Sequence, residues 1–147
     1  MYLASASPRR QELLTQLGVR FEVLPVAVDE EPRPGEGAAD LVCRLASAKA
    51  LAGVAARRDP GIPVVAADTS VALGAELFAK PLDQADADRI LSRLSGRTHA
   101  VFTAVAVADG QRERVELSRS EVTFRALSPE EIAAYWRTGE PADKAGA

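Results

Sequence analysis

Two arginines stand where a helix start does not ordinarily carry positive charge. Ser7 and Pro8 are typical of an N-cap followed by proline in the first helical position, and Arg9 and Arg10 come next. A helix N-terminus is the positive end of the macrodipole and has unsatisfied N–H groups, so two guanidinium groups there favour a multiply charged anion between them. A phosphate chain is such an anion. The alternative is that both arginines point into water.

A carboxylate and a further cation follow at places suited to phosphate chemistry. Asp68 comes directly after the apolar run 64–67, which is typical of a buried strand. Ligands of α/β sheets collect beyond the carboxyl ends of strands, so Asp68 is a candidate site residue, although it can also cap a turn. Lys80 precedes Pro81 and therefore presents a cation on a rigid turn.

Two more charged positions allow a functional and a structural interpretation. Glu30 lies between Asp29 and Glu31 in the loop 25–37, which is rich in proline and glycine. Such an acidic cluster is either a solvated turn or a feature related to metal binding. Lys49 lies on the flank of a helical apolar stripe, where a stem packed along the edge of the core explains it by default.

Strands and helices must hold these side chains, and the periodicity of the sequence predicts both. Strands are predicted over 2–4, 21–24, 64–69, 70–73, 76–78, 100–108 and 112–125, and helices over 8–17, 40–57, 83–94 and 128–138. The first helix is expected to bury Leu13, Leu14 and Leu17, and Asp40 is expected to cap the second. His99 is expected to be a hydrogen-bonded turn residue rather than a catalyst. Together these elements predict an α/β domain with a mixed sheet.

Length and composition narrow the class of protein. A chain of 147 residues with 47% hydrophobic and 27% charged residues fits a single globular domain. The net charge of −3 is spread along the chain, which argues against binding to nucleic acid or to an anionic membrane. Cys43 is the only cysteine, so it cannot form an internal disulfide, and we interpret it as a small core residue. One cysteine and one histidine are too few for a zinc cluster. No membrane span or signal peptide is recognisable, so a cytoplasmic location is expected.

Five groups of residues occur in the order in which a known family carries them. They are Leu3-Ala-Ser-Ala-Ser-Pro-Arg-Arg10, Ala67-Asp-Thr69, Lys80-Pro-Leu-Asp83, Leu94-Ser-Gly-Arg-Thr-His99 with Thr103-Ala-Val105, and Gly139-Glu-Pro with Asp143-Lys-Ala-Gly146. Through them the chain resembles the Maf (septum-formation protein) family of nucleoside triphosphate pyrophosphatases from its first residue to its last. The resemblance implies one Maf-like domain over 1–147.

The resemblance also implies a fold and a reaction. The fold would be α/β and similar to inosine triphosphate pyrophosphatases, with a mixed twisted sheet and flanking helices in an elongated, two-lobed architecture that has a central cleft. Members of the family commonly form homodimers. The reaction would be hydrolysis between the α- and β-phosphates of a nucleoside triphosphate, which releases a monophosphate and pyrophosphate with a divalent cation such as Mg²⁺ or Mn²⁺.

Site residues carry over position by position. Asp68 resembles the proton acceptor proposed for the family. The residues that match those contacting substrate phosphates or shaping the site are Ser5, Arg9, Arg10, Lys49 and Lys80. Glu30 matches an acid needed for activity, and Glu30 and Asp68 are the residues expected to serve the metal.

Specificity follows from two of the matching positions. Arg9 and Thr69 resemble the subfamily that acts on thymidine and uridine triphosphates, whereas the 7-methylguanosine-triphosphate subfamily tends to have Trp and Gln there. We therefore expect a house-cleaning enzyme that removes dTTP, UTP and modified pyrimidine triphosphates. Family members continue beyond a segment like Lys144-Ala-Gly-Ala147, so the chain is expected to lack the family's C-terminal segment. Two alternatives stay open: the methylated-guanosine specificity, and a non-catalytic nucleotide-binding or division-regulating protein.

Overall fold

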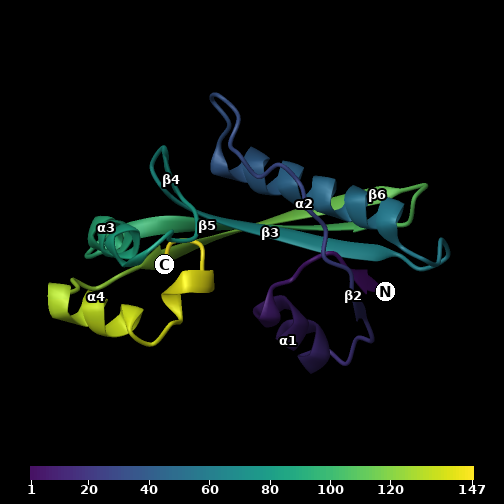
Figure 1. The fold of residues 1–147 in the computed structure, drawn as a ribbon. Helices are drawn as coiled ribbons and strands as arrows, with labels where there is room; N and C mark the ends of the chain where they lie inside the picture. The colour runs from purple at the N-terminus through teal and green to yellow at the C-terminus, as the bar shows by residue number, and fades with distance from the viewer. The chain divides into compact units, whose positions relative to one another are not determined.

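The computed structural model describes residues 1–147, and strands and helices follow one another along the chain (Figure 1). The elements are β1 (Tyr2–Leu3), α1 (Pro8–Gln16), β2 (Glu22–Val23), α2 (Ala38–Ala56), β3 (Val64–Leu73), β4 (Glu76–Phe78), α3 (Gln84–Leu94), β5 (Thr98–Ala108), β6 (Glu113–Thr123), α4 (Pro129–Trp136) and the 3₁₀ helix η1 (Pro141–Asp143). The sheet has the order β2-β1-β3-β5-β6, and β4 pairs with β3. Because it contains parallel and antiparallel pairs, the predicted α/β class with a mixed sheet is confirmed.

The chain folds into two compact units. Unit 1 comprises residues 1–68 and 103–118, and unit 2 comprises residues 69–102 and 119–147. Strands β3, β5 and β6 each contribute residues to both units. The description of the whole chain as one domain stays a prediction.

In unit 1, β1 is the middle strand of a parallel set. Leu3 is paired with Val23 on β2 and with Val65 on β3. The backbone continues this pattern, since the Ala4 N–H donates to the Val65 carbonyl at 2.8 Å and the Leu24 N–H donates to the Leu3 carbonyl at 2.9 Å. Parallel neighbours require crossover connections, which α1 and α2 provide. The residues that follow β1 and the residues that follow Val65 therefore lie at the same end of this set.

One face of β3 is covered by α2 (Figure 1). Val64, Ala66 and Asp68 alternate with half-buried neighbours, so these three side chains share the buried face. Gly53 on α2 allows the close approach, because a Cβ atom at this position would lie 2.6 Å from Cγ1 of Val64. The prediction that the strand ends at Asp68 and Thr69 is wrong, since β3 runs unbroken to Leu73. No glycine or proline interrupts it before Gly74.

The two N-terminal helices depart from the sequence prediction. Leu13 is 52% exposed and Leu17 is 74% exposed, and α1 has no fully buried residue, so the predicted apolar stripe is wrong. Periodicity identifies residues that share a helix face, but it does not show whether another element covers that face. The second helix begins after Gly37 rather than at a cap formed by Asp40. Asp40 instead lies in the first turn of α2, where a negative charge is favourable.

Unit 2 has the elements expected from its capping residues. The Asp83 carboxylate accepts from the Asp86 N–H at the start of α3, and Ser128 and Glu131 form a complete capping box at the start of α4. Helices α3 and α4 contact each other. The core of the unit groups residues from β3, β4 and α3, namely Val71, Phe78, Ile90 and Leu94. None of the helices in the chain has the length and apolar content needed to cross a membrane.

Candidate functional site

A buried lysine joins two carboxylates in unit 1. The Lys49 Nζ lies 2.7 Å from Oδ1 of Asp68 and 2.8 Å from Oε1 of Glu30. Helix α2 and strand β3 explain the meeting of the first two residues. Gly53 contacts Val64, and Lys49 lies one helical turn before Gly53, while Asp68 lies four residues after Val64 on the same face of β3. The long lysine stem covers the remaining separation.

Burial separates the functional from the structural interpretation of Lys49. The side chains of Lys49 and Asp68 are 11% and 13% exposed, whereas Glu30 is 62% exposed. A stem packed along the core edge would place the ammonium group in water, but this group instead contacts a buried carboxylate. A buried charge is costly unless it is paired. Two carboxylates and one ammonium leave the cluster with a net charge of −1, so it can accept a further cation.

The residues that follow β1 organise the start of α1. The Ser5 Oγ accepts from Nη1 of Arg10 at 3.0 Å and from the backbone N–H of Ser7 at 3.2 Å. Ser7 is the N-cap residue, as predicted, but its side chain makes no capping hydrogen bond. The start of α1 therefore combines backbone donors without a side-chain cap and the Arg10 guanidinium, a combination that suits an anion. Arg9, the residue before Arg10, is exposed.

The parallel register places the start of α1 and the Lys49–Asp68 pair at the same end of the parallel set. Leu3 is opposite Val65, so Ser5 lies two residues beyond the paired position on β1 and Asp68 lies three residues beyond it on β3. Ligand sites in α/β proteins occur at this end of parallel strands. The structure therefore brings Lys49, Asp68 and Glu30 into contact, and it brings Ser5 and Arg10 into contact at the same end of the parallel set.

Two further candidates belong to unit 2. Lys80 follows β4 and forms an ion pair with Asp143 of η1, and both side chains are more than half exposed. Thr69 directly follows Asp68 on β3, and it is half-buried. The pairing of Lys80 with Asp143 was missed by sequence reasoning, although Asp143 belongs to one of the stretches that carry the family resemblance.

Arg44 and Glu36 were also missed, and they contact the acidic loop. The Arg44 guanidinium binds the Glu36 carboxylate through two hydrogen bonds, Nε to Oε1 at 2.6 Å and Nη2 to Oε2 at 2.7 Å. The hydrogen bonds from Arg44 and from the backbone of Arg33 lower the pKa of Glu36 from its ordinary value of 4.5 to about 2. Arg44 donates in addition to the backbone carbonyls of Asp29 and Glu31. An arginine between Leu41 and Leu45, two buried positions of α2, is the signal that could have identified it.

The donor set for a metal ion consists of two carboxylates. No group of three or more His, Cys, Asp or Glu side chains in the structure could hold an ion. Glu30 and Asp68 nevertheless converge on one cationic atom, the Nζ of Lys49. Mg²⁺ is bound by one or two carboxylates together with substrate phosphates and water, so this pair of residues fits a metal that arrives with a phosphate substrate.

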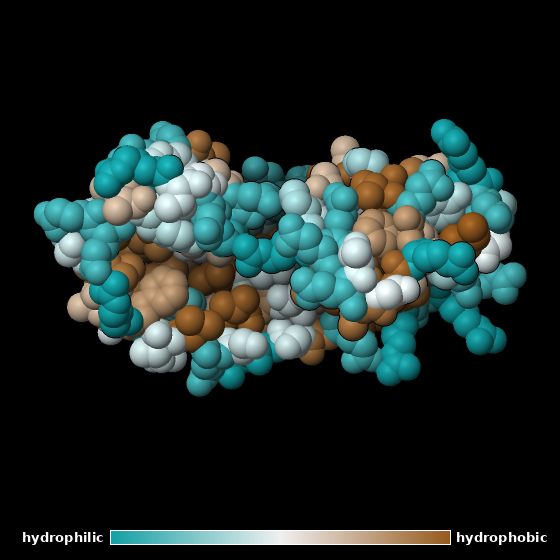
Figure 2. Space-filling model, turned by 90° about the horizontal axis from the view of Figure 1, so that it is seen from below, coloured by the Kyte–Doolittle hydropathy of each residue, from teal (hydrophilic) through white to brown (hydrophobic).

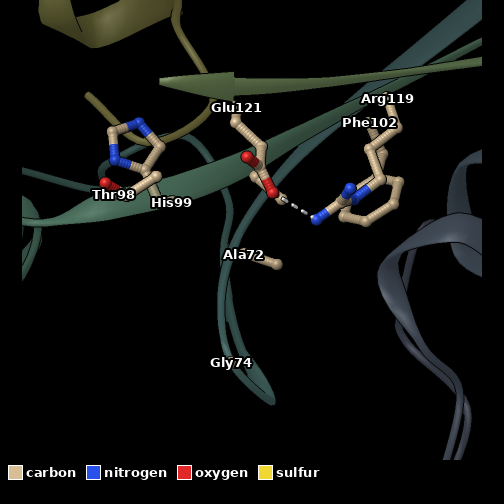
Figure 3. A pocket seen from close by; sticks show the side chains of 8 residues that line it. Ala72, Gly74, Thr98, His99, Phe102, Arg119 and Glu121 are labelled. Atoms are coloured by element: carbon tan, nitrogen blue, oxygen red, sulfur yellow. Dashed lines mark hydrogen bonds and ion pairs between the residues drawn. The ribbon is translucent and has the colours of Figure 1, made fainter. Parts of the chain in front are cut away.

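A shallow pocket in unit 2 contains none of the predicted site residues (Figure 3). It has a volume of about 250 Å³ and lies beside the ion pair of Arg119 and Glu121, whose closest atoms are 2.8 Å apart. His99 lines it as a buried residue of β5, so the prediction that it lies in a turn is wrong. Its ring contacts Phe124 edge-on, and burial lowers its pKa more than a hydrogen bond with the backbone of Arg97 raises it.

A second hollow in unit 2 is mainly apolar. Figure 2 shows hydrophobic side chains gathered in a hollow on the left of the view, the side on which α3 and α4 lie in Figure 1. The residues that line a pocket of about 420 Å³ in this unit are Leu91, Thr123, Phe124, Arg125, Leu127, Glu131, Ile132, Tyr135 and Ala147. Neither pocket of unit 2 gathers the charges that a phosphate chain needs.

Comparison with known proteins gives a consistent family. The family model described as Maf-like protein matches residues 1–147. The dTTP/UTP pyrophosphatase of Myxococcus xanthus is 56% identical over 147 residues, which are 100% of this chain and 74% of that protein. The dTTP/UTP pyrophosphatases of Escherichia coli O6:K15:H31 and Yersinia pestis are 52% and 53% identical over the same shares.

Solved structures support the fold alone, because their sequence identity is low. The dITP/XTP pyrophosphatase of Mycobacterium abscessus matches with a TM-score of 0.51 and 20% identity, over 95% of this chain and 94% of that chain. The Ham1 protein of Staphylococcus aureus matches with a TM-score of 0.53 and 15% identity, over 82% of this chain and 68% of that chain. The predicted likeness to inosine triphosphate pyrophosphatases in fold is thereby confirmed.

Proposed function

The chain belongs to the Maf-like protein family, and we propose that it hydrolyses dTTP and UTP to the nucleoside monophosphate and pyrophosphate. The observation that carries the proposal is the buried pair of Lys49 and Asp68, joined by the exposed Glu30, at the end of the parallel set that follows β1. The names of the relatives that are 52–56% identical support the choice of nucleotide.

The residues of unit 1 provide the chemistry of the reaction. Hydrolysis of a phosphoric anhydride needs its negative charges neutralised and a water molecule held in line with the bond that breaks. Lys49 and Arg10 supply positive charge, and the open start of α1 supplies backbone donors. Asp68 accepts a proton from the attacking water, whose oxygen bonds to phosphorus as the bond between the α- and β-phosphates breaks. Pyrophosphate leaves with the electron pair of that bond.

A divalent cation belongs to the proposal. Glu30 and Asp68 would hold Mg²⁺ or Mn²⁺, and the net charge of −1 in the cluster favours it. When bound, the cation neutralises charge on the phosphates.

Further parts of the proposal concern phosphate binding and base choice. Ser5 holds the Arg10 guanidinium, and Lys80 contributes a further phosphate contact once it exchanges Asp143 for substrate. Arg9 and Thr69 select thymine and uracil bases, and modified pyrimidine triphosphates are substrates too.

We also propose that the protein acts in the cytoplasm as a homodimer. Support for the dimer comes from unit 1, where Val105 and Val107, two residues apart on the same face of β5, are 40% and 43% exposed. Exposed apolar side chains that share one face of a strand are typical of an interaction surface.

Measurement of pyrophosphate release tests the function. The purified protein is incubated with Mg²⁺ or Mn²⁺ and with thymidine, uridine, cytidine or 7-methylguanosine triphosphate. We expect release from the first two, and a rate lowered about 10²- to 10⁴-fold in Asp68→Asn, because that is the range of general base catalysis. Asp59→Asn is the matched control, since Asp59 is an exposed loop aspartate that accepts a backbone hydrogen bond from Gly61.

Each contrary result has a distinct meaning. Wild-type rates in Asp68→Asn would remove Asp68 as the base. Release from 7-methylguanosine triphosphate in preference to the pyrimidines would replace the proposed specificity. Thermal stabilisation by nucleotides without pyrophosphate release would favour a non-catalytic nucleotide-binding protein.

A further inference from the structure

We propose that Arg44, which is held by two hydrogen bonds to Glu36, is a positioning residue that directs the Glu30 carboxylate toward Lys49. Its effect on turnover rests on the proposed function, whereas its effect on the loop does not. None of the motifs that carry the family resemblance includes Arg44 or Glu36, and neither residue contacts the Lys49 ammonium.

The contacts of Arg44 lie on both sides of Glu30. Its Nη2 donates to the Glu31 carbonyl at 3.0 Å, and its Nη1 donates to the Asp29 carbonyl at 3.5 Å. The residues before and after Glu30 are therefore attached to the same guanidinium group. Because the peptide units 29–30 and 31–32 are both held and only one peptide unit lies between them, the direction in which the Glu30 side chain leaves the backbone is restricted.

Glu30 needs such support because it has little of its own. Its side chain is 62% exposed, and the surrounding segment 25–37 contains no helix or strand. An exposed carboxylate that pairs with a lysine gains little stability from the pair, since solvent screens the charges and the side chains lose entropy. Packing around Glu30 therefore does not fix the geometry with Lys49.

Glu36 makes the guanidinium a rigid support. The Arg44 and Glu36 side chains are 19% and 9% exposed, and their two hydrogen bonds fix the plane of the guanidinium group. Glu36 Oε2 also accepts from the backbone N–H of Arg33, which links the far end of the loop to the same pair. Arg44 and Lys49 both belong to α2, so the support and the target of Glu30 are held by one helix.

The chemistry of arginine is needed for this arrangement. A guanidinium group has five donors in a planar fork, so it can bind a carboxylate and two carbonyl oxygens together. A lysine has the same charge, but its single ammonium group cannot reproduce this geometry. Arg44→Lys therefore removes the positioning while it preserves the charge.

The test combines hydrogen–deuterium exchange with kinetics in Arg44→Lys and Glu36→Gln. We expect amide exchange over residues 29–36 to become at least about tenfold faster in both variants, and kcat/KM to fall about 10- to 100-fold, as for partners that orient a metal-binding group. In a Glu30→Gln background, we expect Arg44→Lys to lower kcat/KM further by less than about threefold. The effects of two substitutions that act through the same contact do not add.

Arg125→Lys is the matched control. Arg125 also binds a glutamate through two hydrogen bonds, to Glu131 at 2.6 and 3.0 Å, and donates to a backbone carbonyl, that of Ala126. It lies in unit 2 and contacts no predicted site residue. We expect exchange over residues 29–36 and kcat/KM to equal those of the wild type.

Three results would overturn the proposal. They are unchanged exchange over 29–36 in Arg44→Lys and Glu36→Gln, faster exchange with unchanged kcat/KM, and an equal loss of kcat/KM from Arg44→Lys in the wild-type and Glu30→Gln backgrounds. If the wild type releases no pyrophosphate from any nucleotide, the proposed function fails. Exchange over 29–36 then decides by itself whether Arg44 holds the loop.

Discussion

The most informative perturbation of the site is Lys49→Met, which removes the only positive charge of the Lys49, Asp68 and Glu30 cluster but keeps an unbranched side chain of similar length. Lys49 and Asp68 are 11% and 13% exposed, so the variant leaves a nearly buried carboxylate without its cation. Breaking a buried ion pair in this way costs about 3–5 kcal/mol. We expect a loss near 3 kcal/mol, because a fraction of both side chains remains accessible to water.

We expect Glu30 and Asp68 to have different coupling energies with Lys49. The pair with Glu30 has one partner that is 62% exposed, so its coupling should be below about 1 kcal/mol. The pair with Asp68 is buried on both sides. Asp68→Asn removes the charge that would be left unpaired, so we expect the double variant with Lys49→Met to recover about 2 kcal/mol relative to additivity.

Urea unfolding provides these energies when it is measured on the wild type, on Lys49→Met, Asp68→Asn and Glu30→Gln, and on the two double variants that combine Lys49→Met with each carboxylate substitution. Pyrophosphate release is measured on the same proteins, and Lys49→Met is expected to lose activity together with phosphate binding. A coupling with Glu30 as large as that with Asp68, or a loss below about 1 kcal/mol in Lys49→Met, would refute the assignment of the buried pair.

Three further outcomes are expected. Gly53→Ala should destabilise the protein by about 1–3 kcal/mol in urea unfolding, because the added Cβ would lie 2.6 Å from Cγ1 of Val64; wild-type stability would show that α2 moves away without cost. Lys80→Ala should raise KM and lower kcat, whereas Asp143→Asn should lower KM because it removes the carboxylate that competes with phosphate for Lys80. Steady-state kinetics measure both effects, and wild-type KM values in both variants would contradict a phosphate contact of Lys80. The pKa of Glu36 is about 2 in the folded protein and 4.5 ordinarily, so stability should fall as the pH falls from about 4.5 toward 2. Glu36→Gln should flatten that part of the curve of unfolding free energy against pH, and an unchanged slope would exclude the contribution.

Much of the fold could be predicted because local rules determine it. Proline after serine placed the start of α1, and the periodicity of residues 83–94 and 128–138 placed α3 and α4. The exposed stripe of α1 was predicted wrongly, since its spacing is that of an amphipathic helix but no element covers it. The end of β3 was also wrong, because strand length depends on pairing partners that are distant in sequence.

The site was only partly accessible from the sequence. Asp68 and the arginines of α1 could be singled out as candidates from their positions next to predicted elements. The interpretation of Lys49 depended on whether its ammonium group points into water or into the protein, which periodicity alone does not decide. Arg44 acts through backbone carbonyls, and no residue type at positions 29 or 31 signals that contact.

The alternating burial along β3 makes this segment intolerant of changes in length. Deletion of one residue between Val64 and Asp68 would retain every chemical group of the site but turn the carboxylate to the opposite face of the sheet, away from Lys49. Deletion of two residues would restore the face but draw the carboxylate back along the strand by about 6–7 Å, beyond the reach of the lysine. We therefore expect insertions and deletions to be tolerated in the exposed turn before the strand, whereas residues 64–68 must keep their number.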